Sequence, residues 1–496
     1  MQGPARLYHG IVCLVHHPGI GELIMTRRIG LLAYGVLSAL LCLGAAPLSP
    51  LRVSDNGHFL VTQDGTPFFW LGDTAWSLTK LSNDDIRLYL TDRAAKGFTG
   101  IQVTGGFNED WMGFRESPFL DGDTDRPRES YWRHVDFIVD EAARQGLYVD
   151  LVVMWGQAYK QAFDGDAEKA RRLGLWLGTR YRDRSNVIWV VSGEYDSIND
   201  YVPTLSDEQR ALFVAMAEGL RLGHGGRQLM SIHPGAPASS APEFHQEPWL
   251  DFNMLQSGHM DDAQAWQCHW SGGRCGEAYE LVAMEYDRRP VKPVIDAEPI
   301  YDTKPDGFYM GAPGPGPRVG EDVMRRKAYW AVFAGAFGHV YGHNDIEIFY
   351  VPGEPTSNGQ RGHWQKALDA PAAGQLRHLR TLVESRPMLT RIPDQSLIAS
   401  DPGRGIHHAQ ATRASDGTYA WIYLPTGGSV VANLERLAAP GTASWFDPRT
   451  GQTIPVGGFV NRGTREFDAP GEVRSGNDWV LVLDVQIARS ADGKGE

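Results

Sequence analysis

From Phe68 to about Asn344, short apolar runs alternate with charged, amphipathic stretches, and this alternation constrains the fold more than any other feature of the chain. Such alternation predicts βα units that build a parallel sheet. Eight apolar runs qualify as strands: residues 68–71, 100–103, 148–154, 187–191, 228–232, 252–255, 291–295 and 339–341. Eight repeats predict an α/β fold of the (β/α)8 (TIM) barrel type, in which catalytic side chains lie at the carboxyl ends of the strands.

Two of the intervening stretches carry clear helix signals. In YWRHVDFIVDEAARQG, apolar residues recur at helical spacing from Tyr131 to Ala142, and Gly146 ends the pattern. In SNDDIRLYLTDRAAKG, Ser82 is the expected N-cap and Asp85 stands at the capping-box position. Both stretches end at a glycine, which suits the left-handed residue that follows many helices.

The pattern changes after about Pro387. GTYAWIYLP, GSVVANL, TASWFDPRTGQTI and DWVLVLD are short strand-like runs separated by Gly, Pro and Asp turns, without helical periodicity. We therefore expect an all-β sandwich domain over residues 387–490, after a barrel over residues 47–386. The length of 496 residues suits a barrel of roughly 250–350 residues and a smaller module.

The first 46 residues resemble a leader and not part of the fold. Arg27 and Arg28 precede an apolar stretch over residues 29–43, which is followed by the small residues Gly44, Ala45 and Ala46. This order predicts a signal peptide and export to the periplasm or the medium, with Met25 as the true start. No membrane span is then expected in the mature chain, whereas an uncleaved anchor is the alternative.

Cys268 and Cys275 are the two cysteines outside this leader, and they flank the loop CHWSGGRC. In an exported protein this spacing predicts a small disulfide, and two unpaired thiols are the alternative. Two thiols with only His269 between them are too few for a closed zinc site, so no metal is expected here.

The composition excludes some partners. A formal net charge of −13 argues against nucleic acid or an anionic membrane surface as the main partner. The chain contains 15 Trp and 18 Tyr, whose faces can stack on sugar rings, although most of them are expected in the core.

Polar and aromatic residues follow nearly every predicted strand, which suits a polar substrate such as an oligo- or polysaccharide. The candidate substrate-binding residues are Asp73, Trp76, Trp155, His233, Gln256, His259, Tyr341 and His343. Structural roles are the alternatives: Asp73 as a helix N-cap, the tryptophans as core, and the histidines as loop hydrogen-bond partners.

Two glutamates stand out among the strand ends. Glu194 follows the fourth predicted strand through Ser192 and Gly193, and Glu298 follows the seventh. These strands face each other across a barrel mouth, and glycoside hydrolysis needs a pair of carboxyl groups on either side of the scissile bond. Asp196 and Asp296 are expected to orient backbone or an arginine, and Asp196 is the alternative acid if Glu194 points inward.

Five motifs narrow this interpretation. FFWLGDTAW, NVIWVVSGE, KPVIDAEPIYD, RRKAYWAVFAGAFGHVYGHND and WQKALDAPAAGQLRHL resemble, in this order, the apiosidase-like glycoside hydrolase family over roughly residues 51–385. The family more typically carries Gly-Gly-Asp after strand four, where this chain has Ser192-Gly193-Glu194. The β module resembles the C-terminal domain often attached to the family and named as putative collagen-binding.

The resemblance implies a retaining mechanism without a cofactor, with Glu298 as nucleophile and Glu194 as acid/base. The substrate it implies is a plant or microbial polysaccharide, with apiose-containing pectin among the candidates. Two other functions stay open. One is a non-catalytic carbohydrate-binding or adhesion protein, and the other is a metal-dependent barrel hydrolase. The second would usually need His-x-His on the first strand, where this chain has Gly72-Asp73.

Overall fold

The computed structural model describes residues 48–106, 116–202, 204–262, 276–307, 317–356 and 358–486. The expected leader (1–46) and the expected disulfide between Cys268 and Cys275 lie outside these residues.

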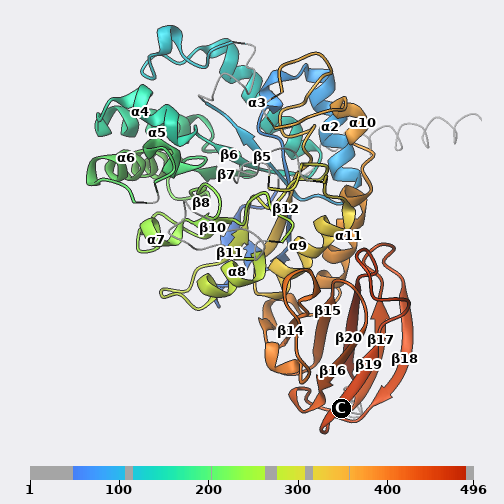
Figure 1. Ribbon diagram of the computed structural model, residues 1–496. Helices are drawn as coiled ribbons and strands as arrows, with labels where there is room; N and C mark the ends of the chain where they lie inside the picture. The colour runs from blue at the N-terminus through green and yellow to red at the C-terminus, as the bar shows by residue number, and fades with distance from the viewer. Residues whose placement is uncertain are drawn as a thin grey trace, which may run out of the picture. The chain divides into compact units, whose positions relative to one another are not determined.

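Eight parallel strands form the barrel (Figure 1). Six pair in the order β12-β4-β5-β6-β7-β8, and β10 pairs with β11. Two backbone hydrogen bonds span the gaps in this ring: Asp251 N–H donates to the Met230 carbonyl (2.9 Å), and Phe337 N–H donates to that of Val294 (3.1 Å). The (β/α)8 prediction is confirmed. The strands are β4 (Trp70–Thr74), β5 (Gly100–Thr104), β6 (Tyr148–Val152), β7 (Val187–Val190), β8 (Met230–Ser231), β10 (Asn253–Gln256), β11 (Val294–Asp296) and β12 (Gly338–Tyr341).

The first barrel strand differs from its expected bounds. Phe68 belongs to a small antiparallel sheet of β1 (Leu51–Val53), β2 (Leu60–Thr62) and β3 (Pro67–Phe68), and β4 extends to Thr74. Pairing with β12 and β5 explains the shift, because Gly72 and Asp73 have ladder partners on both sides. The polar end of this strand is set by its neighbours and not by its own hydropathy.

Helices connect the barrel strands, and the two with clear sequence signals are confirmed. In α2 the Ser82 hydroxyl accepts a hydrogen bond from Asp85 N–H (3.1 Å), and α3 buries Tyr131, Val135 and Ile138. The helices are α2 (Asn83–Ala95), α3 (Glu129–Arg144), α4 (Gly156–Phe163), α5 (Ala167–Arg180), α6 (Asp207–His224), α7 (Ala241–Phe244), α8 (Ala278–Tyr286), α9 (Glu321–Phe333), α10 (Trp364–Ala367) and α11 (Pro371–Glu384). Two short 3-10 helices, η1 (Leu78–Lys80) and η4 (Tyr195–Asn199), follow β4 and β7.

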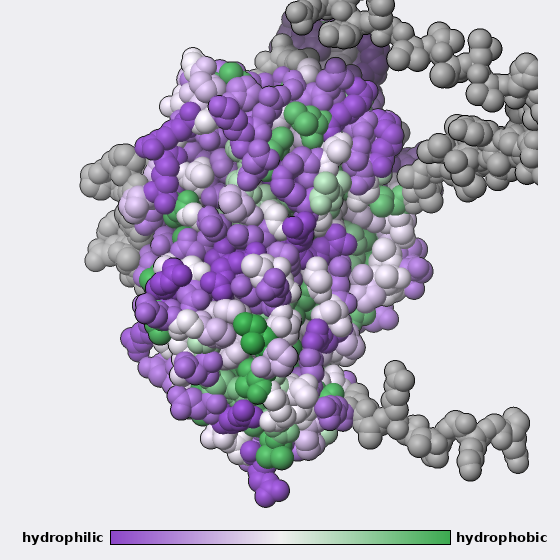
Figure 2. Space-filling model, turned by 90° about the vertical axis from the view of Figure 1, so that its right-hand side faces the viewer, coloured by the Kyte–Doolittle hydropathy of each residue, from purple (hydrophilic) through white to green (hydrophobic). Residues whose placement is uncertain are grey.

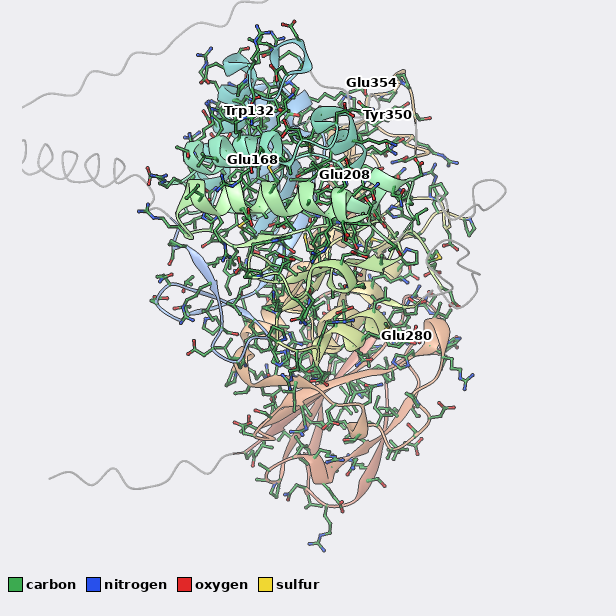
Figure 3. All side chains as sticks on the ribbon, turned by 90° about the vertical axis from the view of Figure 1, so that its left-hand side faces the viewer. Trp132, Glu168, Glu208, Glu280, Tyr350 and Glu354 are labelled. Carbon is green, nitrogen blue, oxygen red and sulfur yellow. The ribbon has the colours of Figure 1, made fainter. Side chains whose placement is uncertain are left out.

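Glycines bring α5 and α6 into close contact (Figure 3, in which Glu168 and Glu208 are labelled). A Cβ on Gly219 would lie 2.1 Å from the Arg171 carbonyl oxygen, and a Cβ on Gly174 would lie 2.3 Å from that of Met216. Since real Cβ atoms do not approach backbone this closely, only glycine permits this spacing between the helices.

The C-terminal part is a sandwich of antiparallel sheets, as the sequence predicts. Its six-stranded sheet has the order β13-β14-β15-β20-β17-β18, and β16 pairs with β19. A core that includes Ile422, Val430 and Phe467 lies between the two sheets. The strands are β13 (Arg391–Pro393), β14 (Gln410–Ala414), β15 (Tyr419–Leu424), β16 (Ser429–Asn433), β17 (Gly441–Phe446), β18 (Thr453–Phe459), β19 (Thr464–Asp468) and β20 (Trp479–Val485); β9 (Ala238–Ser239) pairs with β10.

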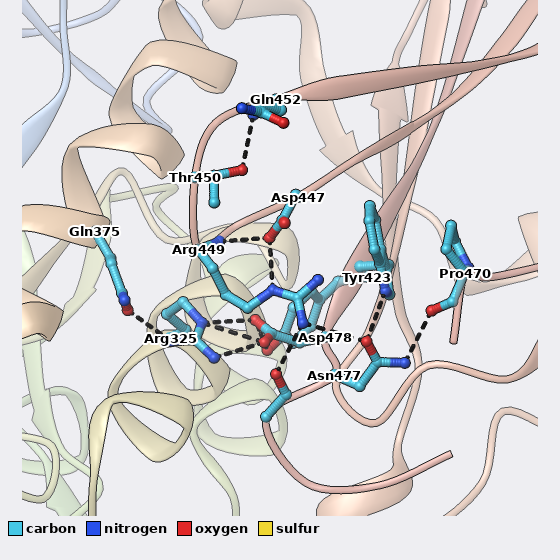
Figure 4. A network of polar contacts seen from close by, with 12 residues as sticks. Arg325, Gln375, Tyr423, Asp447, Arg449, Thr450, Gln452, Pro470, Asn477 and Asp478 are labelled. Atoms are coloured by element: carbon cyan, nitrogen blue, oxygen red, sulfur yellow. Dashed lines mark hydrogen bonds and ion pairs between the residues drawn. The ribbon is translucent and has the colours of Figure 1, made fainter. Parts of the chain in front are cut away.

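The six-stranded sheet is buried on both faces along β15. Ala420 and Ile422 face the sandwich core, whereas Trp421 and Tyr423 join the core of the barrel. Across this contact the Tyr423 ring stacks on Tyr329 of α9, with centroids 4.8 Å apart. The side chain of Arg325 in α9 donates to Asp478 (2.7 Å) in the network of Figure 4.

The exposed surface is mainly hydrophilic on the face that Figure 2 shows, with hydrophobic residues scattered among the polar ones and several in its lower part. Large exposed apolar side chains in the β domain include Ile454, Val456 and Val460, on or beside β18. Within the described ranges, no helix combines the length and apolar character that a membrane crossing needs.

Candidate active site

Glu194 stands four residues after the end of β7, at the N-cap of η4, where the chain turns sharply. Its backbone lies in the left-handed region (φ 35°, ψ 62°), which is unusual for a residue with a side chain. The preceding Gly193 is required by packing, because a Cβ there would lie 2.4 Å from the Trp155 ring. Trp155 Nε1–H donates to Oε2 of Glu194 (3.0 Å), and the Tyr201 hydroxyl donates to the same oxygen (2.8 Å).

Glu298 stands two residues after β11 and is almost fully buried. The Tyr301 hydroxyl donates to its Oε1 (2.5 Å). His259 Nε2 lies 3.3 Å from the same oxygen, and His233 Nε2 lies 3.5 Å from Oε2. Three potential donors therefore surround this carboxylate.

These surroundings give the two glutamates opposite pKa shifts. Burial and the charge of Glu298 raise the pKa of Glu194 to about 8, against the hydrogen bonds from Tyr201 and Trp155. Burial alone would raise the pKa of Glu298 as well, but His259, His233 and Tyr301 outweigh it and lower that pKa. At neutral pH, Glu194 is therefore the protonated partner and Glu298 the ionised one.

Both histidines beside Glu298 are neutral at pH 7. Burial lowers the pKa of His233, and burial together with Lys304 lowers that of His259 to about 4. A neutral imidazole donates one N–H, so each ring can support the Glu298 carboxylate without a charge of its own.

Trp76 and Trp155 line the site and are buried. Their rings meet edge to face with centroids 5.1 Å apart. Trp76 Nε1–H donates to the Tyr301 hydroxyl (2.9 Å), which in turn donates to Glu298. The two indoles thus position Glu298 and Glu194 respectively, one through Tyr301 and one directly. Stacking of a sugar on either ring stays a prediction.

A second buried layer lies behind Tyr301. Lys304 Nζ lies 4.7 Å from the centre of the Tyr301 ring and 3.9 Å from Oε1 of Glu347. Amide donors from Asn358 and Gln360 reach the same glutamate oxygen, at 3.0 and 3.1 Å. Burial raises the pKa of Glu347 to about 7, against the Lys304 charge.

The structure gathers seven of the ten predicted site residues around the two carboxyl groups. Gln256 completes the set, with its Nε2 3.4 Å from Oε1 of Glu194. The seven are Trp76, Trp155, Glu194, His233, Gln256, His259 and Glu298. Their roles in binding and catalysis are not decided by this proximity and stay predictions.

The other three predicted residues have partners away from the pair. Asp73 accepts from the Tyr89 hydroxyl (2.7 Å) and lies 3.3 Å from Arg93 Nη1, so it ties α2 to β4. It caps no helix, since η1 has Ser77 at its N-cap. Tyr341 donates to Asp302 (3.0 Å), and His343 Nδ1 accepts from Asp345 N–H (3.0 Å).

The aspartates near the two glutamates, Asp196 and Asp296, accept hydrogen bonds from backbone N–H groups of neighbouring loops. Asp196 accepts from Gly235 N–H (2.8 Å), and Asp296 accepts from the N–H and the hydroxyl of Ser257 (3.1 and 2.7 Å). Each fixes the loop after a neighbouring strand, β8 and β10 respectively. This agrees with the backbone-orienting role expected of Asp296.

Four residues of the site were missed in the sequence. Tyr301 lies within KPVIDAEPIYD, three residues after Glu298, so its place in that motif was an available signal. Tyr201, Lys304 and Glu347 lie in loops without a periodic pattern, and nothing in the sequence marked them. In the described part of the chain, no cluster of three or more His, Cys, Asp or Glu side chains could hold a metal ion.

Comparison with known families identifies both parts of the chain. Residues 54–390 match the family described as "Apiosidase-like, catalytic domain". The chain belongs to the apiosidase-like family. Residues 392–484 match a second family, described as "Putative collagen-binding domain of a collagenase". No curated protein matches the sequence.

Solved structures agree with this assignment. A structure titled "Glycoside hydrolase" is 32% identical, with 88% of this chain and 97% of that chain covered and a TM-score of 0.77. A glycoside hydrolase family 5 protein from Bacteroides vulgatus is also 32% identical, with 88% and 93% covered and a TM-score of 0.76. This apiosidase-like protein is a glycoside hydrolase.

Proposed function

We propose that this apiosidase-like protein hydrolyses its glycoside with retention, with Glu298 as nucleophile and Glu194 as acid/base. The observation that carries the proposal is the opposite pKa shifts of the two carboxyl groups at the ends of β7 and β11. Retaining and inverting glycosidases both need one carboxylic acid and one carboxylate. Retention is what the resemblance implies, with the acid after the fourth barrel strand and the nucleophile after the seventh.

In the first half-reaction the ionised Glu298 attacks the anomeric carbon. The bond to the leaving oxygen breaks, and that oxygen takes the proton of Glu194. The product is a glycosyl ester of Glu298, in which the carboxylate charge is gone. Since that charge raises the pKa of Glu194, the pKa falls in the intermediate and Glu194 becomes a base.

In the second half-reaction Glu194 takes a proton from water, and the oxygen of this water attacks the anomeric carbon. The ester bond to Glu298 breaks, which restores the carboxylate and gives a sugar of unchanged anomeric configuration. Tyr301, His233 and His259 then again face an ionised carboxylate. Hydrogen-bond donors to a carboxylate favour its departure as a leaving group.

The proposed substrate is a plant or microbial polysaccharide, and apiose-containing pectin is the first to test. The family description supports this choice. At Ser192-Gly193-Glu194 this chain departs from the Gly-Gly-Asp that is more typical of the family. Glutamate is one methylene longer than aspartate, which shifts the proposed acid group relative to the substrate.

Two variants test the mechanism. Glu298→Ala should abolish turnover, and azide should partly restore it with a glycosyl azide of inverted configuration as product. Glu194→Ala should retain the first step on aryl glycosides with good leaving groups and lose it on the polysaccharide. Glu168→Ala, an exposed glutamate of α5, is the control. Wild-type activity of both active-site variants would refute the assignment, and binding without turnover by the wild type would favour an adhesion role.

We also propose export of the protein, on the basis of the leader pattern in residues 25–46. Mass spectrometry of secreted material should give a chain that begins near residues 45–50. A disulfide between Cys268 and Cys275 should make it two hydrogens lighter than the reduced form. A cytosolic product that starts at Met1 would contradict export, and two free thiols in the exported chain would contradict the disulfide.

A further inference from the structure

Tyr201 reaches Glu194 from the loop after η4, and its backbone is strained. Asp200 and Tyr201 both have positive φ (51° and 63°), although neither is glycine. Such residues cost free energy and persist where the surrounding structure holds them. Tyr201 is 41% exposed, yet its hydroxyl lies 2.8 Å from Oε2 of Glu194.

The surrounding loops hold Tyr201 in this place. Its N–H donates to the Asp196 carbonyl (3.1 Å), and the Asp196 carboxylate accepts from Gly235 N–H (2.8 Å). A Cβ on Gly235 would lie 3.0 Å from the Tyr201 ring, so the ring packs against the backbone of the loop after β8. The hydroxyl is thus aimed at Glu194 by loops from two neighbouring strands.

The two oxygens of Glu194 have different partners. Oε2 accepts from both Trp155 Nε1–H and the Tyr201 hydroxyl, whereas Oε1 has a longer contact with Gln256 Nε2 (3.4 Å). A protonated carboxyl group has one O–H and one acceptor oxygen. Because Oε2 is occupied by two donors, the proton of Glu194 belongs on Oε1.

We propose that Tyr201 is a positioning residue of the glycosidase reaction, which directs the proton of Glu194 to Oε1 and stabilises its carboxylate in the second half-reaction. This inference rests on the proposed function. A hydrogen bond to an ionised acceptor is stronger than one to a neutral acceptor, so Tyr201 favours the base form of Glu194. It should therefore assist the step in which water is deprotonated more than the first step.

Other charged groups act on Glu194 and must stay unchanged in the test. They are Glu298 from the end of β11, Asp196 from the same loop, and Lys304 from the loop after β11, with His233 and His259 beside Glu298. Tyr201→Phe removes one hydroxyl and none of these groups. Tyr195→Phe is the matched control, because its hydroxyl in the same segment donates to the Ser239 carbonyl (3.2 Å) and not to Glu194.

The first measurement needs no substrate. Infrared difference spectra against pH should show a carboxylic acid band in the wild type that is missing in Glu194→Gln. In Tyr201→Phe this band should titrate about one pH unit higher, since loss of a hydrogen bond to the carboxylate favours the acid. A midpoint equal to that of Tyr195→Phe, or no such band near neutral pH in the wild type, would overturn the proposal.

The second measurement separates the two half-reactions. On an aryl glycoside that the wild type hydrolyses, Tyr201→Phe should lower kcat about tenfold, with glycosyl-enzyme accumulating, and change kcat/KM less than threefold. Equal losses in both parameters would overturn the role in the second half-reaction. If no glycoside is hydrolysed even by the wild type, the proposed function fails, whereas the infrared result still decides whether Tyr201 controls the proton of Glu194.

Discussion

Glu194 and Glu298 have the same side chain, and their surroundings make them different acids. Glu194 accepts from the indole of Trp155 and the phenol of Tyr201 and lies near the charge of Glu298. Glu298 accepts from the phenol of Tyr301 and has two imidazoles within 3.5 Å. The two imidazoles and the Tyr301 hydroxyl lower the pKa of Glu298 against the effect of burial, whereas the charge of Glu298 adds to the effect of burial at Glu194.

These shifts predict a bell-shaped dependence of kcat/KM on pH. Activity should rise as pH increases through the pKa of Glu298, which is lower than the usual 4.5, because the nucleophile must be ionised. It should fall as pH increases through about 8, where Glu194 loses its proton. Steady-state kinetics on an aryl glycoside tests this. With a good leaving group, Glu194→Ala should lack the alkaline limb, and an unchanged limb would assign it to another group.

Asp73 and Arg93 are a fully buried ion pair between β4 and α2. Burial raises the pKa of Asp73 to about 6, against the opposing charge of Arg93. The carboxylate therefore depends on this guanidinium and on the Tyr89 hydroxyl to remain ionised at neutral pH.

Arg93→Met should lower the free energy of unfolding by about 3–5 kcal/mol at pH 7, because it leaves a buried carboxylate without its cation. The loss should be smaller at pH 5, where Asp73 can take up a proton in the folded state. Arg87→Met on the same helix is the control, since Arg87 is half exposed and pairs with Asp84 at the surface. Chemical denaturation at both pH values measures the difference. Equal losses in the two variants would show that Asp73 does not need Arg93.

Among the elements, the α5–α6 pair shows how glycine spacing sets helix distance. Gly174 and Gly178 on α5 face Gly219 and Gly223 on α6, and each position lies within 2.1–2.6 Å of opposing backbone when a Cβ is added. These helices flank β7 in the sequence, and Glu194 follows the end of β7 by four residues. The distance between these helices therefore affects the position of β7 and of the proposed acid, Glu194.

Gly219→Ala should destabilise the protein by about 1–3 kcal/mol, because its Cβ would lie 2.1 Å from the Arg171 carbonyl oxygen. Gly374→Ala is the matched control in α11, where an added Cβ meets nothing within 4 Å. That change should stabilise by about 0.4–1 kcal/mol through the unfolded chain. Thermal denaturation of both variants gives the comparison. Stabilisation by both would show that the helices can separate without cost.

At the scale of the whole molecule, the barrel and the β domain share one core. Trp421 and Tyr423 of β15 lie in the same cluster as Tyr329 and Phe333 of α9. The buried pair of Arg325 and Asp478 crosses the same contact (Figure 4). This is the packing of one folded unit and not of a module on a mobile linker.

Calorimetry of the full chain should therefore show a single unfolding transition. A chain that ends at residue 390 should be insoluble or partly unfolded, because it exposes the apolar face of α9. Tyr423→Ala should lower the melting temperature of the whole transition through loss of its packing on Tyr329. Two separate transitions, or a soluble and folded barrel fragment, would contradict this interpretation.

The parts of the fold that the sequence determined by itself are those written in local patterns. Strand and helix periodicity, the caps at Ser82 and Gly146, and the change after Pro387 depend on neighbours within a few residues. The order of βα units then places Glu194 and Glu298 at one end of the barrel, because parallel strands all end on the same side. The pair and most of its neighbours could for this reason be found before the structure.

Only the tertiary structure decided which side chains meet. The strand ends predict Tyr341 and His343 as substrate-binding residues, but Tyr341 donates to Asp302. Tyr301, which was not among the predicted residues, lies beside Glu298 together with His233 and His259. Tyr201 reaches Glu194 through two residues of positive φ, which no propensity of Asp or Tyr predicts. Such contacts depend on closure of the ring and on loop conformations, which bring together groups far apart in the chain. The physical reason is that the periodicity of a strand depends on nearby residues. The partner of its last side chain, in contrast, depends on how the whole barrel closes and on which loops this closure brings together.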